Sequence, residues 1–466
     1  MAEVVVLGAG LTGLSVAYHL ESHNYHDYKI FEQGCRPGGL LKTETDNGFC
    51  FDYTGHYLHI SDPYFRNFLE DVAELNTNFD VINRQSSIFL LNTYLNYPFQ
   101  KNLYGLPTEA VYECINGFIN RKIKIKKPQN FYDWVLKYFG AGMGKHFFYP
   151  YNSKLLSYNL KKVQHSWTGR FVPQTDLKSI LCGALENNSE KSVGYNHSFY
   201  YPKQGGIEFL IKSIIARLKN NINISHKVVS VDVISKTVTF ENGHTEKYKY
   251  LISTIPLKHF LKFTNKSSSK NYAKQAEKLH CTSVINFNMG FNKDFICKDH
   301  WTYFPESKFP FYRIGFWHNV SQSLAPNGMT SIYGETSFIH GTKTQSQINR
   351  LAEKSIKSAL AHLQISDSNL LVTKILHIEH AYVIYDEWRE KNLNKLLNDL
   401  IAKQIYSSGR YGEWNYSSMQ EAVISGKALA ANILNNLKTL NLSQILNTQN
   451  LKNNEIKRIS SKNLVA

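Results

Sequence analysis

The fold of this chain is decided near its start, by residues 4–13, Val4-Val5-Val6-Leu7-Gly8-Ala9-Gly10-Leu11-Thr12-Gly13. The four apolar residues that open this stretch predict a short strand buried in a parallel sheet. They lead directly into Gly-x-Gly-x-x-Gly, and residues 14–20 then have the pattern of a helix. In this fingerprint Gly8 permits a tight turn, Gly10 lets a pyrophosphate approach the backbone, and Gly13 lets the helix pack against the strand. The free N–H groups at the helix start would then face the phosphates.

A second predicted strand, residues 28–31, runs into Glu32. The fingerprint has an acid at this place, about 20 residues after its glycines, where the carboxylate accepts hydrogen bonds from a ribose. A purely structural glycine turn is the alternative, but such a turn would not need the strand, the helix and the acid around it. The pattern therefore predicts a dinucleotide-binding site.

A second glycine-rich turn follows, Gly34-Cys35-Arg36-Pro37-Gly38-Gly39, and it leads into Leu40. Such a turn is unusual in nicotinamide enzymes and typical of flavoproteins, where it wraps the far side of the FAD pyrophosphate. We therefore expect FAD. The next tight turn, residues 52–56, would place His56 at the edge of the flavin. A histidine that is satisfied by the backbone of its own turn is the alternative for His56.

The chain has 466 residues, 42% of them hydrophobic, which predicts a globular protein of two or three domains. Its net charge of +16 would attract nucleic acid, an anionic surface or an anionic small substrate. The densest basic run, residues 121–127, alternates with isoleucines and is interpreted as a solvated amphipathic edge. No nucleic-acid motif accompanies this run, so we expect no nucleic-acid partner.

The six cysteines form no C-x-x-C pair, and their spacing predicts neither disulfides nor a zinc site, nor any other metal site. We find no signal peptide and no apolar run of the roughly 18 residues that are needed to span a bilayer. The expectation is a soluble, cytoplasmic protein without a membrane span.

The remaining patterns predict an α/β protein: a Rossmann-type FAD-binding domain with a helical insertion and an antiparallel β-sheet domain. The predicted boundaries are 1–72, 204–270 and 405–437 for the FAD-binding domain, 100–185 for the helical substrate domain, 73–99, 186–203 and 271–404 for the β-sheet domain, and 438–466 for a loosely ordered tail. Within the first domain, residues 237–240 and 248–252 flank the turn Glu241-Asn242-Gly243 and predict a hairpin. Near the C-terminus, a turn at Gly409 precedes a small-residue helix, residues 419–437, whose first N–H groups would return beneath the flavin.

Several separated motifs resemble those of the UDP-galactopyranose mutases, and within that family the eukaryotic type, over about residues 3–437. The glycine turns are shared with many FAD oxidases and discriminate little. The more specific motifs are Phe51-Asp52-Tyr53-Thr54-Gly55-His56, Tyr97-Pro98-Phe99-Gln100, Pro150-Tyr151-Asn152-Ser153-Lys154, Tyr303-Phe304-Pro305-Glu306, Pro310-Phe311-Tyr312-Arg313 and Gly409-Arg410-Tyr411-Gly412-Glu413-Trp414-Asn415-Tyr416.

The resemblance implies an FAD enzyme that interconverts UDP-galactopyranose and UDP-galactofuranose, or a close nucleotide sugar, for cell-surface glycan biosynthesis. In this family the reduced flavin N5 attacks the anomeric carbon and displaces UDP, and the flavin–sugar adduct closes again with the other ring size, without net redox change. The family also suggests NADPH or NADH as the reductant and leaves the oligomeric state open.

Residue roles carry over position by position. His56 matches the histidine on the flavin loop, Arg313 the arginine that clamps the diphosphate, and Arg410 an arginine near the flavin and the sugar. These three are the predicted catalytic residues. The predicted substrate-binding residues are Tyr97, Phe99, Gln100, Asn152, Arg170, Asn196, Tyr303, Arg313, Tyr382 and Tyr416. For each tyrosine a position in the core is the alternative. The predicted cofactor-binding residues are Gly8, Gly10, Thr12, Gly13, Glu32, Gln33, Gly38, Gly39, Leu40, His56, Val228, Gly409, Arg410, Ser417 and Met419.

Two positions depart from the family pattern. The family has Trp-x-Gly-Glu-Arg where this chain has residues 167–171, so that Phe171 occupies the arginine position and Arg170 falls one residue early. On a helix one residue is a turn of about 100°, so Arg170 need not reach the same phosphate. Leu156 stands where the family has tryptophan. Both changes lie on the pyrophosphate and sugar side, so the choice of nucleotide sugar is left open.

Two other functions are left open as well. The fold-level features fit an FAD-dependent oxidoreductase of the amine oxidase or protoporphyrinogen oxidase type equally well. An apolar amine or porphyrin site would not need Arg313 among hydroxyl groups, which favours the mutase. Phe171 and Leu156 are the support for a flavoprotein that binds a nucleotide sugar without converting it.

Overall fold

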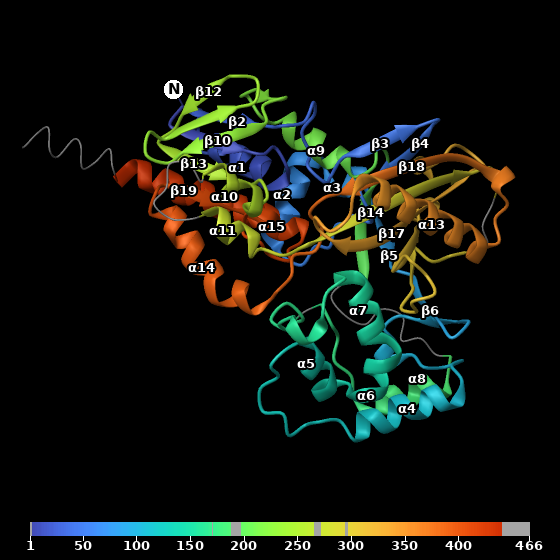
Figure 1. Ribbon diagram of the computed structural model, residues 1–466. Coiled ribbons are helices and arrows are strands. Elements are labelled where there is room, and N and C mark those ends of the chain that lie inside the picture. Colours follow the sequence, from blue (N-terminus) through green and yellow to red (C-terminus); the bar gives the residue numbers. More distant parts are fainter. Residues whose placement is uncertain (1, 170, 188–196, 265–271, 294–296, 440–466) are drawn as a thin grey trace, which may run out of the picture.

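The computed structural model describes residues 2–169, 171–187, 197–264, 272–293 and 297–439. One sheet has five parallel strands, in the spatial order β19 (Ile405–Ser407), β13 (Tyr250–Ser253), β1 (Val4–Leu7), β2 (Tyr28–Phe31) and β9 (Ile222–Asn223) (Figure 1). The two strands expected at the start of the chain, β1 and β2, are therefore present at the centre of this sheet.

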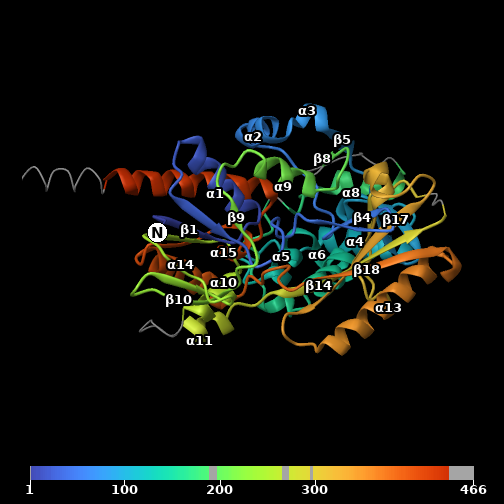
Figure 2. The same cartoon turned by 90° about the horizontal axis from the view of Figure 1, so that it is seen from above.

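The side chains of β1 alternate between two apolar cores, one on each face of the parallel sheet. Val4 and Val6 pack with helices α1 (Leu11–Ser22), α9 (Glu208–Ile215) and a C-terminal helix, residues 419–439. Val5 and Leu7 pack with α10 (Leu257–Phe263) and α14 (Glu387–Ile401). Figure 2 shows the long C-terminal helix, in red, beside α1, and the hydroxyl of Ser15 donates to the carbonyl of Val423 between them (2.8 Å). The result is a sheet with helices on both faces, the arrangement of Rossmann-type folds.

A second sheet has seven strands, in the order β18 (Leu370–Ile378), β14 (Thr282–Phe291), β17 (Thr330–Ile339), β16 (Arg313–Phe316), β15 (Trp301–Tyr303), β6 (Ser86–Leu90) and β7 (Thr93–Asn96). Its pairs are antiparallel except for β15 and β6, which run parallel. Helix α13 (Gln345–Leu363) begins with a capping box of Thr344 and Gln347 and packs on this sheet through Ile348 and Ala352.

The helices expected in the middle of the chain form a lobe of their own, the lower part of Figure 1. They are α4 (Thr108–Ile119), α5 (Phe131–Tyr138), α6 (Gly140–Met143), α7 (Tyr149–Leu156) and α8 (Leu177–Leu185). Most of their aromatic rings share one apolar core, as the spacing predicted. At Gly142 a Cβ would lie 2.0 Å from the carbonyl oxygen of Glu113, so α4 and α6 touch through their backbones.

The remaining elements connect these parts. They are β3 (Thr43–Asp46), β4 (Phe49–Asp52), α2 (Pro63–Ala73), α3 (Leu75–Asn78), β5 (Phe79–Asn83), β8 (Ser198–Pro202), β10 (Val228–Asp232), β11 (Thr237–Phe240), β12 (Thr245–Lys247), α11 (Tyr272–Glu277), α12 (Trp317–Val320) and α15 (Gly409–Gly412). The predicted α/β class, with a Rossmann-type sheet, a helical insertion and an antiparallel sheet, is thus confirmed. The domain boundaries stay a prediction.

Two local predictions are corrected. The hairpin partner of β11 is β12, whereas residues 250–253 form β13 and pair in parallel with β1. All four residues of β13 are buried, so this strand belongs in the middle of the parallel sheet rather than in a surface hairpin. The expected tail begins too early, because residues 438 and 439 continue the last helix; residues 440–466 lie outside the described part of the chain.

In the described part of the chain, each helix is too short or too polar to cross a bilayer.

Candidate active site

Two glycine-rich turns face each other at the carboxyl ends of β1 and β2. A Cβ on Gly39 would lie 3.3 Å from the Cα of Gly10, and a Cβ on Gly13 would lie 2.0 Å from the Gly8 carbonyl oxygen. Helix α1 begins at this point without a side chain that caps its first N–H groups. These groups are therefore available to a phosphate.

A third turn reaches the same place from the C-terminal part of the chain. Gly409 has a φ of +82°, and a Cβ there would lie 2.4 Å from the Oγ1 of Thr12 at the start of α1. Gly38 joins the first turn by donating to the carbonyl of Ala9 (2.9 Å). Three turns that are distant in the sequence thus surround the start of α1, and a cradle that only glycine can line fits the pyrophosphate of FAD.

Glu32 ties the first two turns together. Its carboxylate accepts from the N–H groups of Ala9 (3.0 Å) and Gly34 (2.9 Å). The carboxylate is therefore held at the carboxyl end of β2, where the fingerprint places the group that recognises a ribose. The other predicted cofactor residues are distributed as follows: Gln33 is exposed, Val228 is buried at the start of β10, and Leu40, Ser417 and Met419 are half-buried.

The loop that carries His56 is anchored by a buried acid. Asp52, the last residue of β4, accepts from the hydroxyls of Thr43 (2.6 Å) and Tyr201 (2.6 Å), and the N–H of Ile207 lies 3.3 Å away. Burial raises the pKa of Asp52 to about 6, although these hydrogen bonds oppose the rise. Because Asp52 joins β3, β8 and the start of α9, the position of the loop after it is fixed.

His56 itself lies between two arginines. Its N–H donates to the carbonyl of Thr54 (2.9 Å), whose φ of +70° bends the loop. Burial, with the charges of Arg410 and Arg313, lowers the pKa of His56 to about 4, so the imidazole is neutral near pH 7. Within the described residues its buried Nδ1 makes no hydrogen bond of good geometry, although backbone groups of Tyr53 and Thr54 lie near enough to the ring to oppose the fall in pKa. A flavin or substrate atom at this position would satisfy that nitrogen.

Arg313 begins β16 and is held by a buried acid on β17. Its Nε and Nη2 donate to Glu335 Oε1 at 2.9 and 2.6 Å, and Tyr312 donates to the other carboxylate oxygen. Burial alone would lower the pKa of Arg313, but the charge of Glu335 outweighs it, and the pKa is raised. The carboxylate is buried and 17% of the arginine side chain is exposed, so the guanidinium is fixed with one edge accessible.

Arg410 lies among tyrosines. Its guanidinium carbon is 4.8 Å from the ring centre of Tyr416 and 5.9 Å from that of Tyr382. In the described part of the chain it donates to two backbone carbonyls, those of Ser417 (2.5 Å) and Ala381 (3.3 Å), and to no carboxylate. Within the described residues Arg410 is thus surrounded by carbonyls, aromatic rings and the hydroxyl of Tyr411 but by no carboxylate, which suits an anionic ligand.

The predicted uracil-side residues lie where the sheet meets the helical lobe. The ring centres of Tyr97 and Tyr303 are 5.3 Å apart. Gln100 and Asn152 are buried and donate to nearby backbone carbonyls at 2.6 and 2.8 Å. The ring of Phe99 is fully buried in the core of the lobe, so it packs against protein rather than against a ligand.

Arg170 and Asn196, which the sequence predicts to bind substrate, lie outside the described residues.

The two departures from the family pattern, Phe171 and Leu156, both lie beside Tyr416. The ring of Phe171 contacts that of Tyr416 edge-on, with centres 4.7 Å apart, and Leu156 lines a small cavity beside the same tyrosine. Phe171 stands in place of a charged residue and makes this wall of the site more apolar, whereas Leu156 replaces one apolar side chain by a smaller one.

Sequence patterns did not single out Glu335 or the hydroxyl pair of Tyr57 and Tyr333, which lie 3.3 Å apart. An acid in the otherwise apolar and polar-neutral strand β17 is the signal that could have identified Glu335. A carboxylate that is buried in this way requires a cation or several donors, and Arg313 provides the cation.

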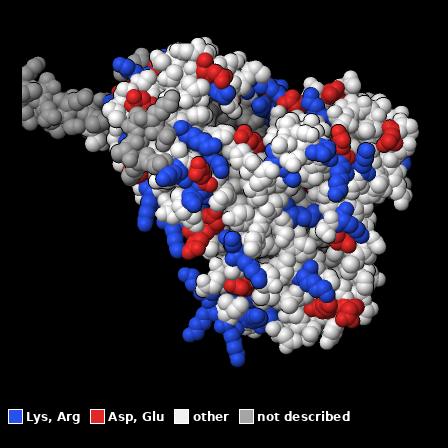
Figure 3. Space-filling view, viewed as in Figure 1, with Lys and Arg blue, Asp and Glu red and all other residues white. Residues whose placement is uncertain are grey.

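On the face shown in Figure 3, Lys and Arg side chains are interspersed with Asp and Glu, and several basic side chains project from the lower lobe. In the described part of this face they form no continuous stripe of the kind that nucleic-acid-binding proteins use.

The glycine cradle and the two-sheet fold define an FAD-dependent flavoprotein. The chain belongs to the flavin-containing amine oxidoreductase family, whose sequence pattern matches residues 11–434. It is therefore an enzyme of the FAD-dependent amine oxidase superfamily.

Individual relatives have different activities. A solved structure of reduced UDP-galactopyranose mutase is 27% identical, with a TM-score of 0.85, over 93% of this chain and 94% of that chain. A protein provisionally assigned as a protoporphyrinogen oxidase, from Exiguobacterium sp. 255-15, is 15% identical with a TM-score of 0.71, over 93% of this chain and 98% of that chain, which is a likeness of fold alone. Coproporphyrinogen III oxidase of Staphylococcus aureus (strain NCTC 8325 / PS 47) is 21% identical over 60% of this chain and 66% of that protein, just under two thirds of its length.

Proposed function

We propose that this protein is a flavin-dependent mutase of the eukaryotic type that interconverts UDP-galactopyranose and UDP-galactofuranose, or a close UDP-sugar, without net redox change. The observation that carries the proposal is a pair of cations near His56: Arg313, held by Glu335, and Arg410, which lies over the rings of Tyr382 and Tyr416. Both charges help to lower the pKa of His56. Two such cations match the negative charges of a diphosphate, whereas a protonated amine would be repelled by them. The likeness to the reduced mutase, at 27% identity, supports the same function.

Arg313 would bind the diphosphate. Its bonds to Glu335 use the Nε and Nη2 edge of the guanidinium, which leaves the Nη1 edge for a phosphate oxygen. Because Glu335 fixes the side chain in advance, little rotamer entropy is lost when the substrate binds. Arg410 would offset the remaining negative charge, and the hydroxyls of Tyr303 and Tyr382 would donate to the same oxygens.

Reduced FAD, held by the glycine cradle, would supply the nucleophile for the anomeric carbon, and NADPH or NADH would supply its electrons. The side chains of the protein would position the sugar and the base. His56 is neutral near pH 7, so its Nδ1 can form one hydrogen bond without adding a charge. Tyr97 and Gln100 would hold the uracil, and Asn152 would face the sugar.

The direct test is conversion of UDP-galactofuranose by the purified protein without oxygen, with the flavin reduced by dithionite and the products separated by chromatography. We expect UDP-galactopyranose to form. Arg313→Ala should reduce the rate strongly, whereas Arg350→Ala, the same change at an exposed position of α13, should leave it unchanged. If no UDP-hexofuranose yields a pyranose product, the proposal is wrong.

An oxidoreductase is the second candidate. The likeness to porphyrinogen oxidases, in fold for one and in sequence for another, and the apolar ring of Phe171 against Tyr416 favour it. Such an enzyme would form hydrogen peroxide steadily in air with an amine or a porphyrinogen. Steady peroxide formation without any isomerisation would therefore favour the oxidoreductase. A UDP-dependent change in flavin fluorescence without either reaction would indicate a binding protein.

A further inference from the structure

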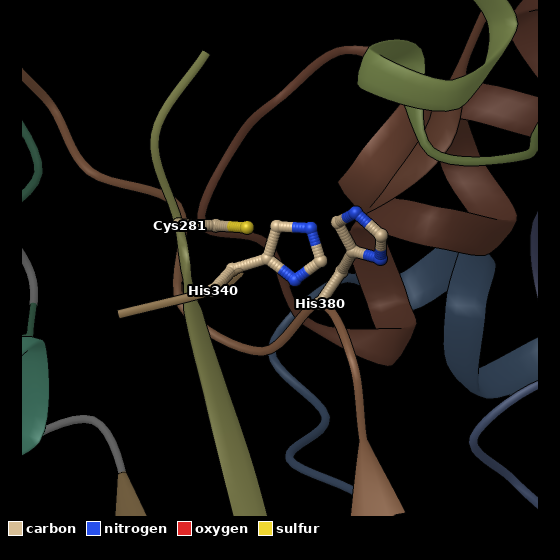
Figure 4. Close-up of side chains that lie close together, drawn as sticks. All are labelled: Cys281, His340 and His380. Carbon is tan, nitrogen blue, oxygen red and sulfur yellow. The ribbon is translucent and has the colours of Figure 1, made fainter. Parts of the chain in front are cut away.

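Three neighbouring strands of the seven-stranded sheet each have one end beside a group of Cys, His and Glu side chains, and Figure 4 shows Cys281, His340 and His380. Cys281 directly precedes β14, His340 follows β17, and Glu379 and His380 follow β18. We call these four residues the strand-end cluster. Strand β14 runs antiparallel to both neighbours, so its beginning lies beside their ends. Sheet topology therefore brings together residues that no spacing motif in the sequence connects.

The donor atoms of the strand-end cluster converge. One ligand atom from each of Cys281, His340 and His380 lies within 4.8 Å of the other two. The carboxylate of Glu379 is 3.9 Å from His340 Nε2 and 4.0 Å from His380 Nδ1. In a tetrahedral zinc site, bonds of about 2.0–2.3 Å place neighbouring ligand atoms roughly 3.3–3.8 Å apart. Side-chain shifts of about 1 Å would bring Cys281, His340 and His380 to these separations. Glu379 lies beside the Nδ1 of His380 rather than its Nε2, so its exposed side chain would have to rotate to become the fourth ligand.

His380 gives a second, independent observation. The side chain is only 5% exposed, and in the described part of the chain its Nε2 has no hydrogen-bond partner. A buried imidazole nitrogen without a partner costs free energy that a metal bond would recover. Cys281 is similarly buried, at 1% exposed, whereas Glu379 lies at the surface and leaves a path for an ion to enter.

Neighbouring groups orient the ligands. The Oγ of Ser283 lies 3.3 Å from His340 Nδ1, which leaves Nε2 turned toward Glu379. His259, on helix α10, places its Nε2 3.4 Å from the Glu379 carboxylate. Outer partners of this kind fix ring orientation and ligand basicity in metal sites. His259 also links the cluster to the helices that cover the parallel sheet.

We propose that the strand-end cluster binds one zinc ion, which ties together the ends of three strands of the antiparallel sheet beside the FAD-binding part of the molecule. Sulfur and imidazole ligands favour zinc over magnesium or calcium, and the thiolate and carboxylate balance its two positive charges. On binding, the Cys281 thiol releases its proton to solvent. Ala381 follows His380 directly, and its carbonyl accepts from Arg410 and Tyr411 (both 3.3 Å). The ion would thus steady the backbone beside the substrate site without touching the reacting atoms.

Metal content tests the proposal. The flavin-loaded full-length protein is treated with a chelator, dialysed, titrated with Zn²⁺ and measured by plasma mass spectrometry. We expect one tightly bound zinc per chain in the wild type and almost none in Cys281→Ser or His380→Gln. Cys182→Ser and His377→Gln are matched controls, because both residues are exposed and lie outside the cluster; they should bind zinc normally. Flavin content in the same samples separates loss of metal from loss of fold.

Cobalt provides a spectroscopic check. Co²⁺ in a tetrahedral site with a thiolate ligand absorbs at longer wavelengths than oxidised flavin, and we expect this absorption in the wild type and the controls but not in Cys281→Ser. Absence of stoichiometric zinc in the wild type, or retention of zinc by both cluster variants, would overturn the proposal. If the variants lose their flavin, titration of the wild type with Zn²⁺ and Co²⁺ alone decides.

Discussion

Arg313 and Glu335 form a buried ion pair in the candidate site. The carboxylate is held by Arg313 and Tyr312 and has no access to water, so it needs the arginine as much as the arginine needs it. The same pair leaves one edge of the guanidinium accessible. Arg313 can therefore neutralise the buried carboxylate of Glu335 and still offer N–H donors to a ligand.

Replacing Arg313 by alanine should weaken UDP binding about 30- to 150-fold, because a charge-assisted bond to phosphate contributes about 2–3 kcal/mol. Arg313→Lys should have an intermediate effect, since an ammonium keeps the charge but not the planar fork. Titration with UDP, followed by flavin fluorescence, measures both, with Arg350→Ala as the control. Unchanged affinity in Arg313→Ala would show that the diphosphate binds elsewhere.

Asp52 gives the stability of the flavin loop a pH dependence. Burial raises its pKa from 3.8 to about 6, so between these values the folded chain keeps a proton that the unfolded chain has released. The contribution of Asp52 to stability is therefore full below about pH 4 and is lost as the pH rises through about 6.

Asp52→Asn does not titrate and should remove this dependence. When the pH is raised from about 5 to about 8, the wild type should lose about 1–1.5 kcal/mol of unfolding free energy relative to Asp52→Asn. Urea unfolding at both pH values measures the difference. Asp46→Asn, on the same hairpin, is the control. A difference for Asp52→Asn that does not change with pH would contradict the assignment.

At the scale of elements, the cofactor cradle depends on turns that approach more closely than side chains permit. Gly409→Ala strains a backbone at φ +82° and sets a Cβ 2.4 Å from Thr12 Oγ1, so α15 must move away from α1. We expect this variant to lose most of its flavin, measured as flavin absorbance per protein.

Gly243→Ala is the matched control for Gly409→Ala. Its φ of +83° imposes the same backbone strain, of about 1–2 kcal/mol, but no atom lies within 4 Å of the added Cβ. Its flavin content should equal that of the wild type. A Gly409→Ala protein with a full complement of flavin would show that α15 does not close the cradle.

Sequence patterns predict an element correctly where local chemistry determines it. The apolar run before Gly8 and the glycine spacing suffice for β1 and the start of α1. Residues 251–256 also have the pattern of a buried strand, but the sequence does not show that β13 pairs with β1, because this pairing joins residues that are distant in the sequence. The nearby turn therefore suggested the wrong partner for β11. Glu335 was missed for the same reason, since its partner Arg313 lies on another strand.

At the scale of the whole molecule, the candidate site lies where three parts meet. Arg313 comes from the antiparallel sheet, Arg410 from the end of the parallel sheet, and Asn152 from the helical lobe. These residues could be predicted from the resemblance to a family, because the motifs of that family can be matched to the sequence residue by residue. The resemblance could not reveal that Phe99 faces the lobe core or that Phe171 and Leu156 both approach Tyr416, since these are consequences of packing.

The central claim is that the reduced flavin acts as a catalyst and is not consumed. The most direct measurement is the number of product molecules formed for each flavin that has been reduced by one electron pair. The protein is reduced without oxygen by one equivalent of dithionite, and UDP-galactofuranose is added in large excess. We predict many molecules of UDP-galactopyranose per flavin, with the flavin still bleached at the end. One product molecule or fewer per flavin, together with the return of the oxidised absorbance, would contradict the claim.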